Sequence, residues 1–168
     1  EGASICDLTH AMGINPPSLY AAFGNKDQLF CQALDRYGEV YAELRDEVLS
    51  APTAREGVES LLREAARNLT DKSSPAGCLY VQAIAGGGEY ADCIRDMLKT
   101  KRADNEREVR RRLERAKAKG ELPDDADPAA LARYFSTVAQ GMSVQAAGGA
   151  TRQDLERVVD YALRVWPT

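Results

Sequence analysis

Two hydroxyl side chains and one cation stand close together near the start of this chain. Ser18 and Tyr20 follow the proline pair Pro16-Pro17, and Lys26 comes shortly after them. Hydroxyl groups donate hydrogen bonds to phosphate oxygens and to base edges, the two targets that proteins contact on DNA. A lysine beside the amide-rich start of a helix adds a phosphate clamp. These residue types and their spacing therefore favour contact with nucleic acid.

The flanking residues predict two short helices joined by a turn. Ser4 and Asp7 form a capping box at the start of the first helix, and Gly13 ends it. Asn15 caps the second helix, whose first position is Pro16, where a missing N–H is harmless. We expect a small shared core of Ile5, Leu8, Met12, Leu19 and Phe23. This is a helix-turn-helix, whose second helix can enter a major groove.

The stretch GASICDLTHAMGINPPSLYAAFGNKDQLF, from Gly2 to Phe30, resembles the reading head of the tetracycline-repressor (TetR) family of bacterial regulators. The matching features are Gly13-Ile14, Ser18-Leu19-Tyr20, Phe23 and Asn25-Lys26. The resemblance implies that the DNA-contacting residues are Ser4, Ile5, Asn15, Pro16, Pro17, Ser18, Tyr20, Ala21 and Lys26.

Two features of the head depart from the family pattern. The family's first helix, which braces the head, is missing from this sequence, which opens at Glu1. Residues 1–37 carry Lys26 and Arg36 against four carboxylates, which gives a net charge of 2 − 4 = −2. We therefore expect a missing N-terminal segment to supply positive charge for DNA.

Helical patterns fill the rest of the chain, and no segment reads as a strand. Apolar stripes of helical period run over about 25–49, 53–69, 78–85, 89–119, 127–147 and 151–166. We predict an all-α fold in which a helix-turn-helix head and linker helix, residues 1–46, join a helical ligand-binding and dimerisation bundle, residues 47–168. The glycine triplet at 86–88 follows an apolar helix rather than a strand, so it favours an interhelical joint over a phosphate loop.

Aromatic and methionine side chains on the central helices are open to two interpretations. They can fill the core by themselves, or they can line the effector cavity that the family resemblance implies. We expect an apolar pocket of at least ~300 Å³ with few charges and several hydroxyls, suited to an apolar or aromatic ligand. Its candidate residues are Tyr37, Tyr41, Leu62, Tyr80, Ile84, Met97, Tyr134, Val138 and Met142.

The last helix carries an apolar stripe that is larger than packing on one side requires. We expect it to form a homodimer interface with its symmetry mate, through Leu155, Val158, Val159, Ala162 and Trp166.

Residues 95–119 hold eleven Lys/Arg and five Asp/Glu, a net of 11 − 5 = +6. This pattern favours a solvated helix face with paired charges, and a second nucleic-acid surface is the alternative.

Several classes of protein receive little support. His10 is the single histidine, and no nucleophile motif accompanies it, so an enzyme is the least favoured interpretation, and we expect no metal or cofactor. Cys6, Cys31, Cys78 and Cys93 are widely spaced, which favours free thiols over a redox pair. The absence of a long apolar run argues against a membrane protein and for a cytoplasmic one.

The function expected from the sequence is that of a bacterial ligand-responsive repressor. It would bind a palindromic double-stranded operator as a homodimer and release it when a small molecule binds. The alternative is a helical partner-binding or sensor protein that does not read DNA. The sequence does not define the operator, the effector or the regulated genes.

Overall fold

Eight α-helices and one 3₁₀ turn account for the regular structure in the residues that the computed structural model describes, 3–85 and 92–167. The helices are α1 (Ile5–Met12), α2 (Pro16–Phe23), α3 (Lys26–Leu49), α4 (Ala54–Leu69), α5 (Leu79–Ala85), α6 (Asp92–Ala118), α7 (Pro128–Ala147) and α8 (Arg152–Ala162), followed by η1 (Leu163–Val165). The predicted all-α class is confirmed. The glycine triplet at 86–88 lies outside the described residues.

The helix starts form as the capping pattern predicts. Thr53 Oγ1 accepts a hydrogen bond from the Glu56 N–H at 3.2 Å, and Glu56 Oε2 accepts one from the Thr53 N–H at 3.1 Å. Ser4 with Asp7 and Thr151 with Asp154 repeat this box at α1 and α8. Each box satisfies N–H groups that have no partner within the helix, so it fixes where the helix begins.

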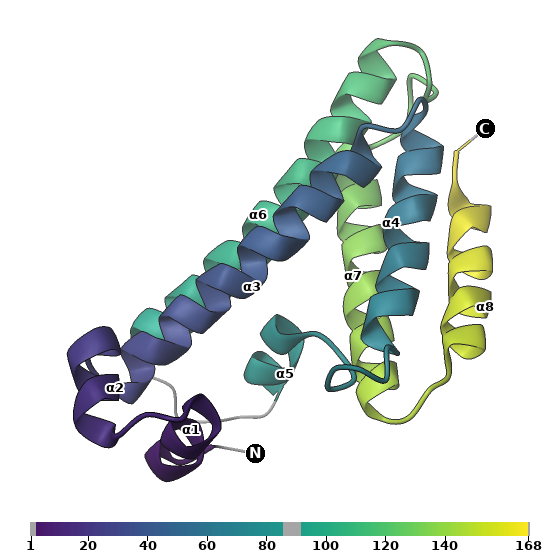
Figure 1. Cartoon of the computed structure of the whole chain (residues 1–168). Coiled ribbons are helices and arrows are strands. Elements are labelled where there is room, and N and C mark those ends of the chain that lie inside the picture. Colours follow the sequence, from purple (N-terminus) through teal and green to yellow (C-terminus); the bar gives the residue numbers. More distant parts are fainter. Residues whose placement is uncertain (1–2, 86–91, 168) are drawn as a thin grey trace.

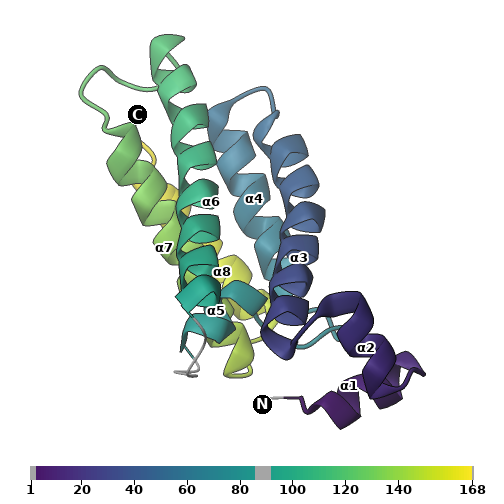
Figure 2. The ribbon, with the colours of Figure 1, turned by 90° about the vertical axis from the view of Figure 1, so that its left-hand side faces the viewer.

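The body consists of a pair of long helices that crosses a layer of three. Helices α3 and α6 run side by side, and α4, α7 and α8 form the layer (Figure 1). At 1.5 Å per residue, the 24 residues of α3 span ~36 Å. Helices α1 and α2 sit at one end of α3 (Figure 2), so α3 belongs to both the head and the body.

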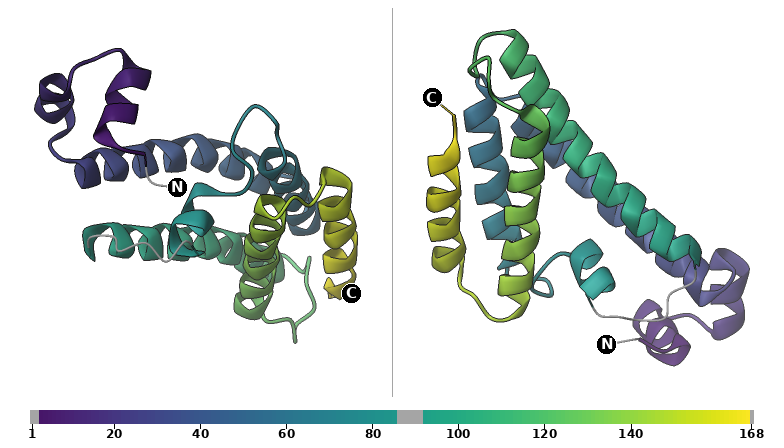
Figure 3. Two further views of the ribbon diagram at one scale, coloured as in Figure 1. Left: turned by 90° about the horizontal axis from the view of Figure 1, so that it is seen from below. Right: turned by 180° about the vertical axis from the view of Figure 1, so that it is seen from behind.

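Two separate hydrophobic clusters hold the body together. The large core joins α4, α6, α7 and α8, and its fully buried members include Val58, Leu62, Leu113, Phe135, Leu155 and Val159. The small core lies nearer the head, where α5 packs beside α3 and α6 (Figure 3), and consists of Leu34, Tyr80, Ala83, Ile94 and Leu98. The ends of α3 and α6 nearest the head are therefore held by a much smaller apolar cluster than their far ends.

The core of the head differs from expectation at one position. Leu19 is fully buried between α1 and α2, but Met12 is 44% exposed. Thr9 is buried instead, and its hydroxyl donates to the carbonyl of Ile5 at 2.9 Å. Because that hydrogen bond satisfies the hydroxyl within the helix, threonine can occupy an apolar position that a sequence pattern assigns to larger side chains.

Three further predictions can be compared with the structure. The domain boundary proposed at residue 46 falls inside α3, which continues to Leu49, so this division stays a prediction. Cys6, Cys31 and Cys78 carry thiols and form no disulfide among the described residues, and the side chain of Cys93 lies outside them. Within the described ranges, no helix combines the length and the apolar composition that crossing a bilayer requires.

Candidate nucleic-acid interface and ligand cavity

Helix α2 presents one face to solvent and the other to α1, within the head. Leu19 faces inward, whereas five predicted contact residues are exposed: Pro16, Pro17, Ser18, Tyr20 and Ala21. Tyr20 is 49% exposed, so its ring and hydroxyl are accessible from solvent. The structure therefore brings these five residues onto one short, accessible helix.

Two other predicted contact residues have structural roles. The Ser4 hydroxyl accepts the Asp7 N–H, and the Asn15 carbonyl oxygen accepts the Ser18 N–H at 2.9 Å. These bonds cap α1 and α2, so each side chain has an atom committed to its own helix. Ile5 is half-buried at the start of α1.

Lys26 is exposed at the first residue of α3, next to the turn that ends α2. Gly24 makes this turn with a φ of 78°, a left-handed conformation that glycine adopts easily. A Cβ there would also meet the Gln28 amide oxygen at 1.8 Å, and that oxygen accepts the Asn25 N–H at 2.8 Å. The turn thus places Lys26 directly after α2, at the start of α3, where Asn25 Oδ1 accepts the Gln28 N–H at 2.8 Å.

A cavity of about 230 Å³ lies where the two cores meet. Helices α3, α4, α5, α6 and α7 contribute to it. Tyr80 of the small core and Phe135 of the large core both line it. Its polar and charged lining residues are Tyr37, Tyr41, Arg45, Glu64, Asn68, Cys78, Tyr80, Arg102, Asn105, Ser136 and Gln140.

Three tyrosines form a continuous aromatic wall. The ring centroids of Tyr37 and Tyr41 are 4.5 Å apart, and those of Tyr37 and Tyr80 are 5.2 Å apart in an edge-to-face arrangement. Burial raises the pKa of Tyr37, and a hydrogen bond with Cys78 adds to the increase. The Tyr37 hydroxyl therefore stays protonated and is already hydrogen-bonded at the cavity wall.

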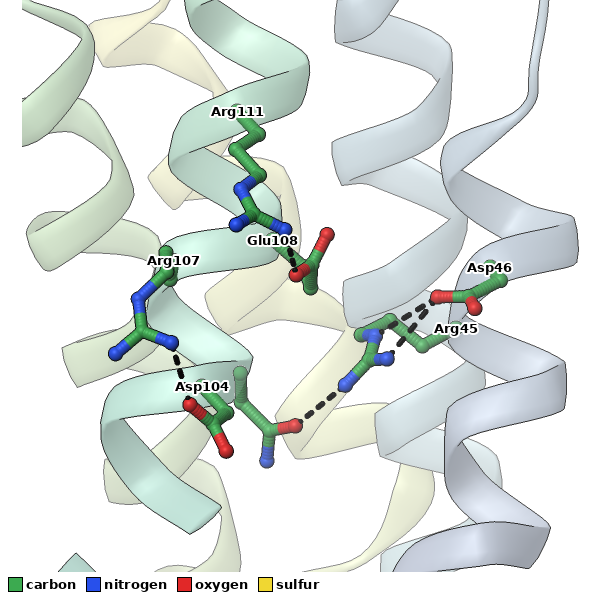
Figure 4. A network of polar contacts seen from close by, with 7 residues as sticks. Arg45, Asp46, Asp104, Arg107, Glu108 and Arg111 are labelled. Atoms are coloured by element: carbon green, nitrogen blue, oxygen red, sulfur yellow. Dashed lines mark hydrogen bonds and ion pairs between the residues drawn. The ribbon is translucent and has the colours of Figure 1, made fainter. Parts of the chain in front are cut away.

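Charged and amide side chains also line the cavity. Arg45 reaches from α3 toward α6, as Figure 4 shows. Its Nη1 donates to the Asn105 side-chain oxygen at 2.7 Å, and its Nε and Nη2 contact Asp46 at 3.1 and 3.0 Å. Arg102, also on α6, donates to the Gln140 amide oxygen of α7 at 2.6 Å. These contacts link the three helices around the cavity.

The cavity matches the predicted ligand residues only in part. Tyr37, Tyr41 and Tyr80 line it. The other six lie outside its lining: Leu62, Ile84, Met97, Tyr134, Val138 and Met142. Leu62 and Met142 are buried in the large core, while Ile84 and Tyr134 face solvent. The cavity is also smaller than the expected ~300 Å³ and carries more charge than we predicted.

Tyr80 joins the cavity directly to the backbone of α3. Its hydroxyl donates to the Leu34 carbonyl at 2.8 Å, and a Cβ at Gly38 would lie only 2.3 Å from that hydroxyl. Lys101 of α6 forms an ion pair with Asp35 at 2.8 Å, and this contact raises the pKa of Lys101. We call these two contacts the head-side latch, because both hold α3 near the head.

The comparisons with known proteins agree with this geometry. Residues 54–162 match the family model described as "Tetracyclin repressor-like, C-terminal domain". The chain belongs to the TetR family. The match covers α4 to α8, and so lies outside the Gly2–Phe30 stretch whose motifs resemble the family.

Several similar proteins align with this chain over almost its whole length. The HTH-type transcriptional repressor ComR of Escherichia coli K12 is 34% identical over 171 residues, which cover 99% of this chain and 80% of ComR. A solved structure of the TetR family regulator CifR, a cysteine mutant complexed with 26-bp operator DNA, is 45% identical with a TM-score of 0.93. That alignment covers 99% of this chain and 87% of the CifR chain. A TetR regulator from Rhodococcus sp. RHA1 is 43% identical with a TM-score of 0.72, over 99% of this chain and 89% of its own.

The five residues predicted to form the dimer interface differ in their exposure in this TetR family chain. Leu155, Val159 and Ala162 are buried within the monomer. Trp166 is half-buried and packs near Phe135, with centroids 5.9 Å apart. Of the five residues, Val158 is the one that lies exposed, at 42%.

Sequence reasoning missed the polar half of the cavity. Arg45 continues the Tyr37–Tyr41 face of α3, with the helical spacing of four, so this face offered a signal. Arg102, Asn105 and Gln140 carried no such signal, because Arg102 and Asn105 lie in the strongly charged run of α6 and their pairing with α3 and α7 depends on the tertiary fold.

Proposed function

We propose that this chain is a bacterial transcriptional repressor that binds operator DNA through α2 and releases it when a small molecule occupies the cavity. The observation that carries the proposal is the exposed face of α2 on a chain that aligns along 99% of its length with a regulator solved on operator DNA. Ser18 and Tyr20 would contact base edges or phosphates, and Lys26 would clamp a phosphate. The proposed role is binding rather than catalysis, in the cytoplasm.

The proposed assembly is a homodimer that places two copies of α2 in successive major grooves of a palindromic operator. Exposed apolar side chains on α7, α8 and η1 support this surface: Val144, Val158, Tyr161 and Val165. Gly141 lies on the same helix as Val144, and a Cβ there would meet nothing within 4 Å. Such open, apolar helix faces fit a symmetric four-helix contact.

The proposed coupling runs through the head-side latch. A ligand beside Tyr80 would alter its hydrogen bond to Leu34 and so change how α3 is held near the head. A ligand shifts the equilibrium only by its difference in affinity for the two states, typically 5–150-fold. Release follows if the ligand prefers the arrangement in which the two heads do not fit one operator.

Selection from a random double-stranded DNA library tests the reading head. We expect enrichment of a palindrome, and Lys26→Ala to reduce the slope of log affinity against log salt by about one unit. Tyr20→Phe should weaken binding by ~1 kcal/mol through loss of one hydrogen bond. Lys119→Ala is the matched control, because Lys119 is exposed just after α6, at the end of the body away from the head. Failure to enrich any sequence with the folded protein would favour the partner-binding alternative.

A further inference from the structure

The size of the cavity limits what it can hold. Its volume is about 230 Å³. An apolar cavity of about 150 Å³ can already bind benzene. The space therefore suits a molecule with one ring and a small substituent, and it is too small for a large multi-ring drug.

One wall of the cavity suits the flat face of such a ring. Tyr37 contacts both Tyr41 and Tyr80, and Phe135 lines the cavity from α7. Aromatic rings pack against one another in offset or edge-to-face arrangements, like those already formed within this wall.

The polar part of the lining carries a positive charge that no ion pair among the described side chains neutralises. Among the side chains that the structure describes, which exclude that of Glu47, no carboxylate lies within ion-pair distance of Arg102, whose acceptor is the neutral amide oxygen of Gln140. Arg45 is paired with Asp46, and Glu64, the acidic residue in the lining, is paired with Arg67. Arg102 is therefore the charged group of the lining that remains available to a ligand.

A basic groove adjoins the cavity at Arg102 and Gln140, which line both spaces. Its other lining cations are Lys99, Arg107, Arg110 and Arg133, and Glu106 is its carboxylate. Ion pairs with Asp96, Asp104, Glu114 and Glu106 partly neutralise these four cations. Clefts lined by one sign of charge raise the local concentration of the opposite ion, so the groove favours the approach of anions.

We propose that the effector is a small aromatic acid, whose ring packs against the tyrosine wall and whose carboxylate binds Arg102. This inference rests on the proposed function, since it names the class of ligand for the same cavity. A carboxylate can accept two parallel N–H bonds from a guanidinium, which gives both strength and orientation. Aromatic walls also attract cations, but Arg102 would repel a cationic ligand, and a neutral ligand would leave its charge unused.

Calorimetry on the purified protein tests the ligand class without any DNA. The probes are benzoate, phenylacetate and 4-hydroxybenzoate, each compared with its neutral primary amide, and benzylamine as the cationic probe. We expect at least one acid to bind ten times or more tightly than its amide, and benzylamine to show no binding. If every acid binds no better than its amide, or if none of the probes binds, the proposal is overturned.

Arg102→Gln identifies the charge that is responsible. This variant should reduce the binding of the acid to within about threefold of the amide while leaving the amide unaffected. Arg110→Gln is the matched control, because Arg110 lines the adjoining groove on the same helix but not the cavity. Equal acid binding by wild type and Arg102→Gln would overturn the assignment.

Operator binding measured without ligand separates this inference from the proposed function. A protein that binds its selected operator but prefers amides to acids would refute the ligand class and leave the repressor function intact. A protein that binds acids through Arg102 but enriches no DNA sequence would refute the repressor function and leave the ligand class intact.

Discussion

The two ends of α3 are held in different ways. At the far end, Arg112 of α6 is buried and donates to the carbonyls of Leu49 and Ala51 at 3.1 and 3.3 Å. Near the head, the contacts are the Tyr80 hydroxyl on Leu34 and a partly exposed ion pair between Lys101 and Asp35. The far end belongs to the large core, whereas the head end packs on the small one.

This difference assigns a role to each end. The far end is fixed, because Arg112 also contacts Glu121 at 3.5 Å, and Glu121 accepts the Ala54 N–H at the start of α4 at 2.7 Å. The head end can be moved at low cost, because an exposed ion pair is worth ~0–1 kcal/mol and one hydrogen bond ~0.5–1.5 kcal/mol. We therefore expect a ligand bound next to Tyr37 and Tyr80 to act on the end that is easier to move.

The largest expected effect concerns the large core and separates it from the dimer surface. Val159→Glu should lower the free energy of unfolding by ~4 kcal/mol or more, because it places an unpaired charge at a fully buried position. The neighbouring Val158→Glu should leave each monomer folded and yield monomers in sedimentation. If Val158→Glu stays dimeric, the proposed surface on α7 and α8 is wrong.

The next effect removes the clamp at the far end. Arg112→Met should lower the free energy of unfolding by ~1–3 kcal/mol, because the Leu49 and Ala51 carbonyls lose their donor in a buried environment. Arg111→Met is the matched control on the exposed face, where Arg111 pairs with Glu108, and it should change stability by no more than ~0.5 kcal/mol. Denaturant unfolding measures both. Equal stability of the two variants would show that the far end is not specially fixed.

A smaller effect is expected at the head-side latch. Tyr80→Phe keeps the ring in the small core and removes one hydrogen bond, so unfolding should become easier by ~0.5–1.5 kcal/mol. Its operator affinity without ligand should change as well. Tyr134→Phe, at a tyrosine that is 38% exposed and lies outside the cavity lining, should alter neither quantity. A Tyr80→Phe variant with wild-type operator affinity would remove the latch from the coupling route.

The smallest effect is a change in pH dependence at the clamp. The hydrogen bond from the Ala54 N–H, aided by Arg112, lowers the pKa of Glu121 from its ordinary 4.5. A lowered folded-state pKa adds stability above pH 4.5, and this stability is lost as pH falls through the folded-state value. Glu121→Gln should therefore lose less stability than wild type between about pH 6 and pH 3. Parallel acid unfolding curves for the two proteins would contradict this assignment.

The head was largely predictable from the sequence because its structure depends on neighbours in the chain. The Ser4–Asp7 box, the Asn15 cap and the Gly13 turn all form over a few residues. The paired charges of α6 were predictable for the same reason, as with Asp104–Arg107 and Glu108–Arg111 in Figure 4. Arg112 broke this pattern, since its buried partners lie on another part of the chain.

The cavity and the dimer surface were less predictable because they depend on contacts between distant segments. An apolar stripe shows that one face of α8 is buried, but not whether its own chain or a second copy covers it. Val159 proved to be inside the monomer, whereas Val158 faces outward. Likewise, Tyr134 and Tyr80 look alike in sequence, and only the fold shows that Tyr80 alone of the two lines the cavity.

We expect that filling the cavity lowers the affinity of the head for operator DNA. Ala139→Phe tests it without any ligand, because Ala139 lines the cavity and a phenyl ring there would occupy part of its volume. Ala130→Phe, at an exposed position on α7, is the matched control. We expect Ala139→Phe to bind the selected operator about fivefold or more weakly than the control, in fluorescence anisotropy. A folded Ala139→Phe dimer with unchanged operator affinity would contradict the account.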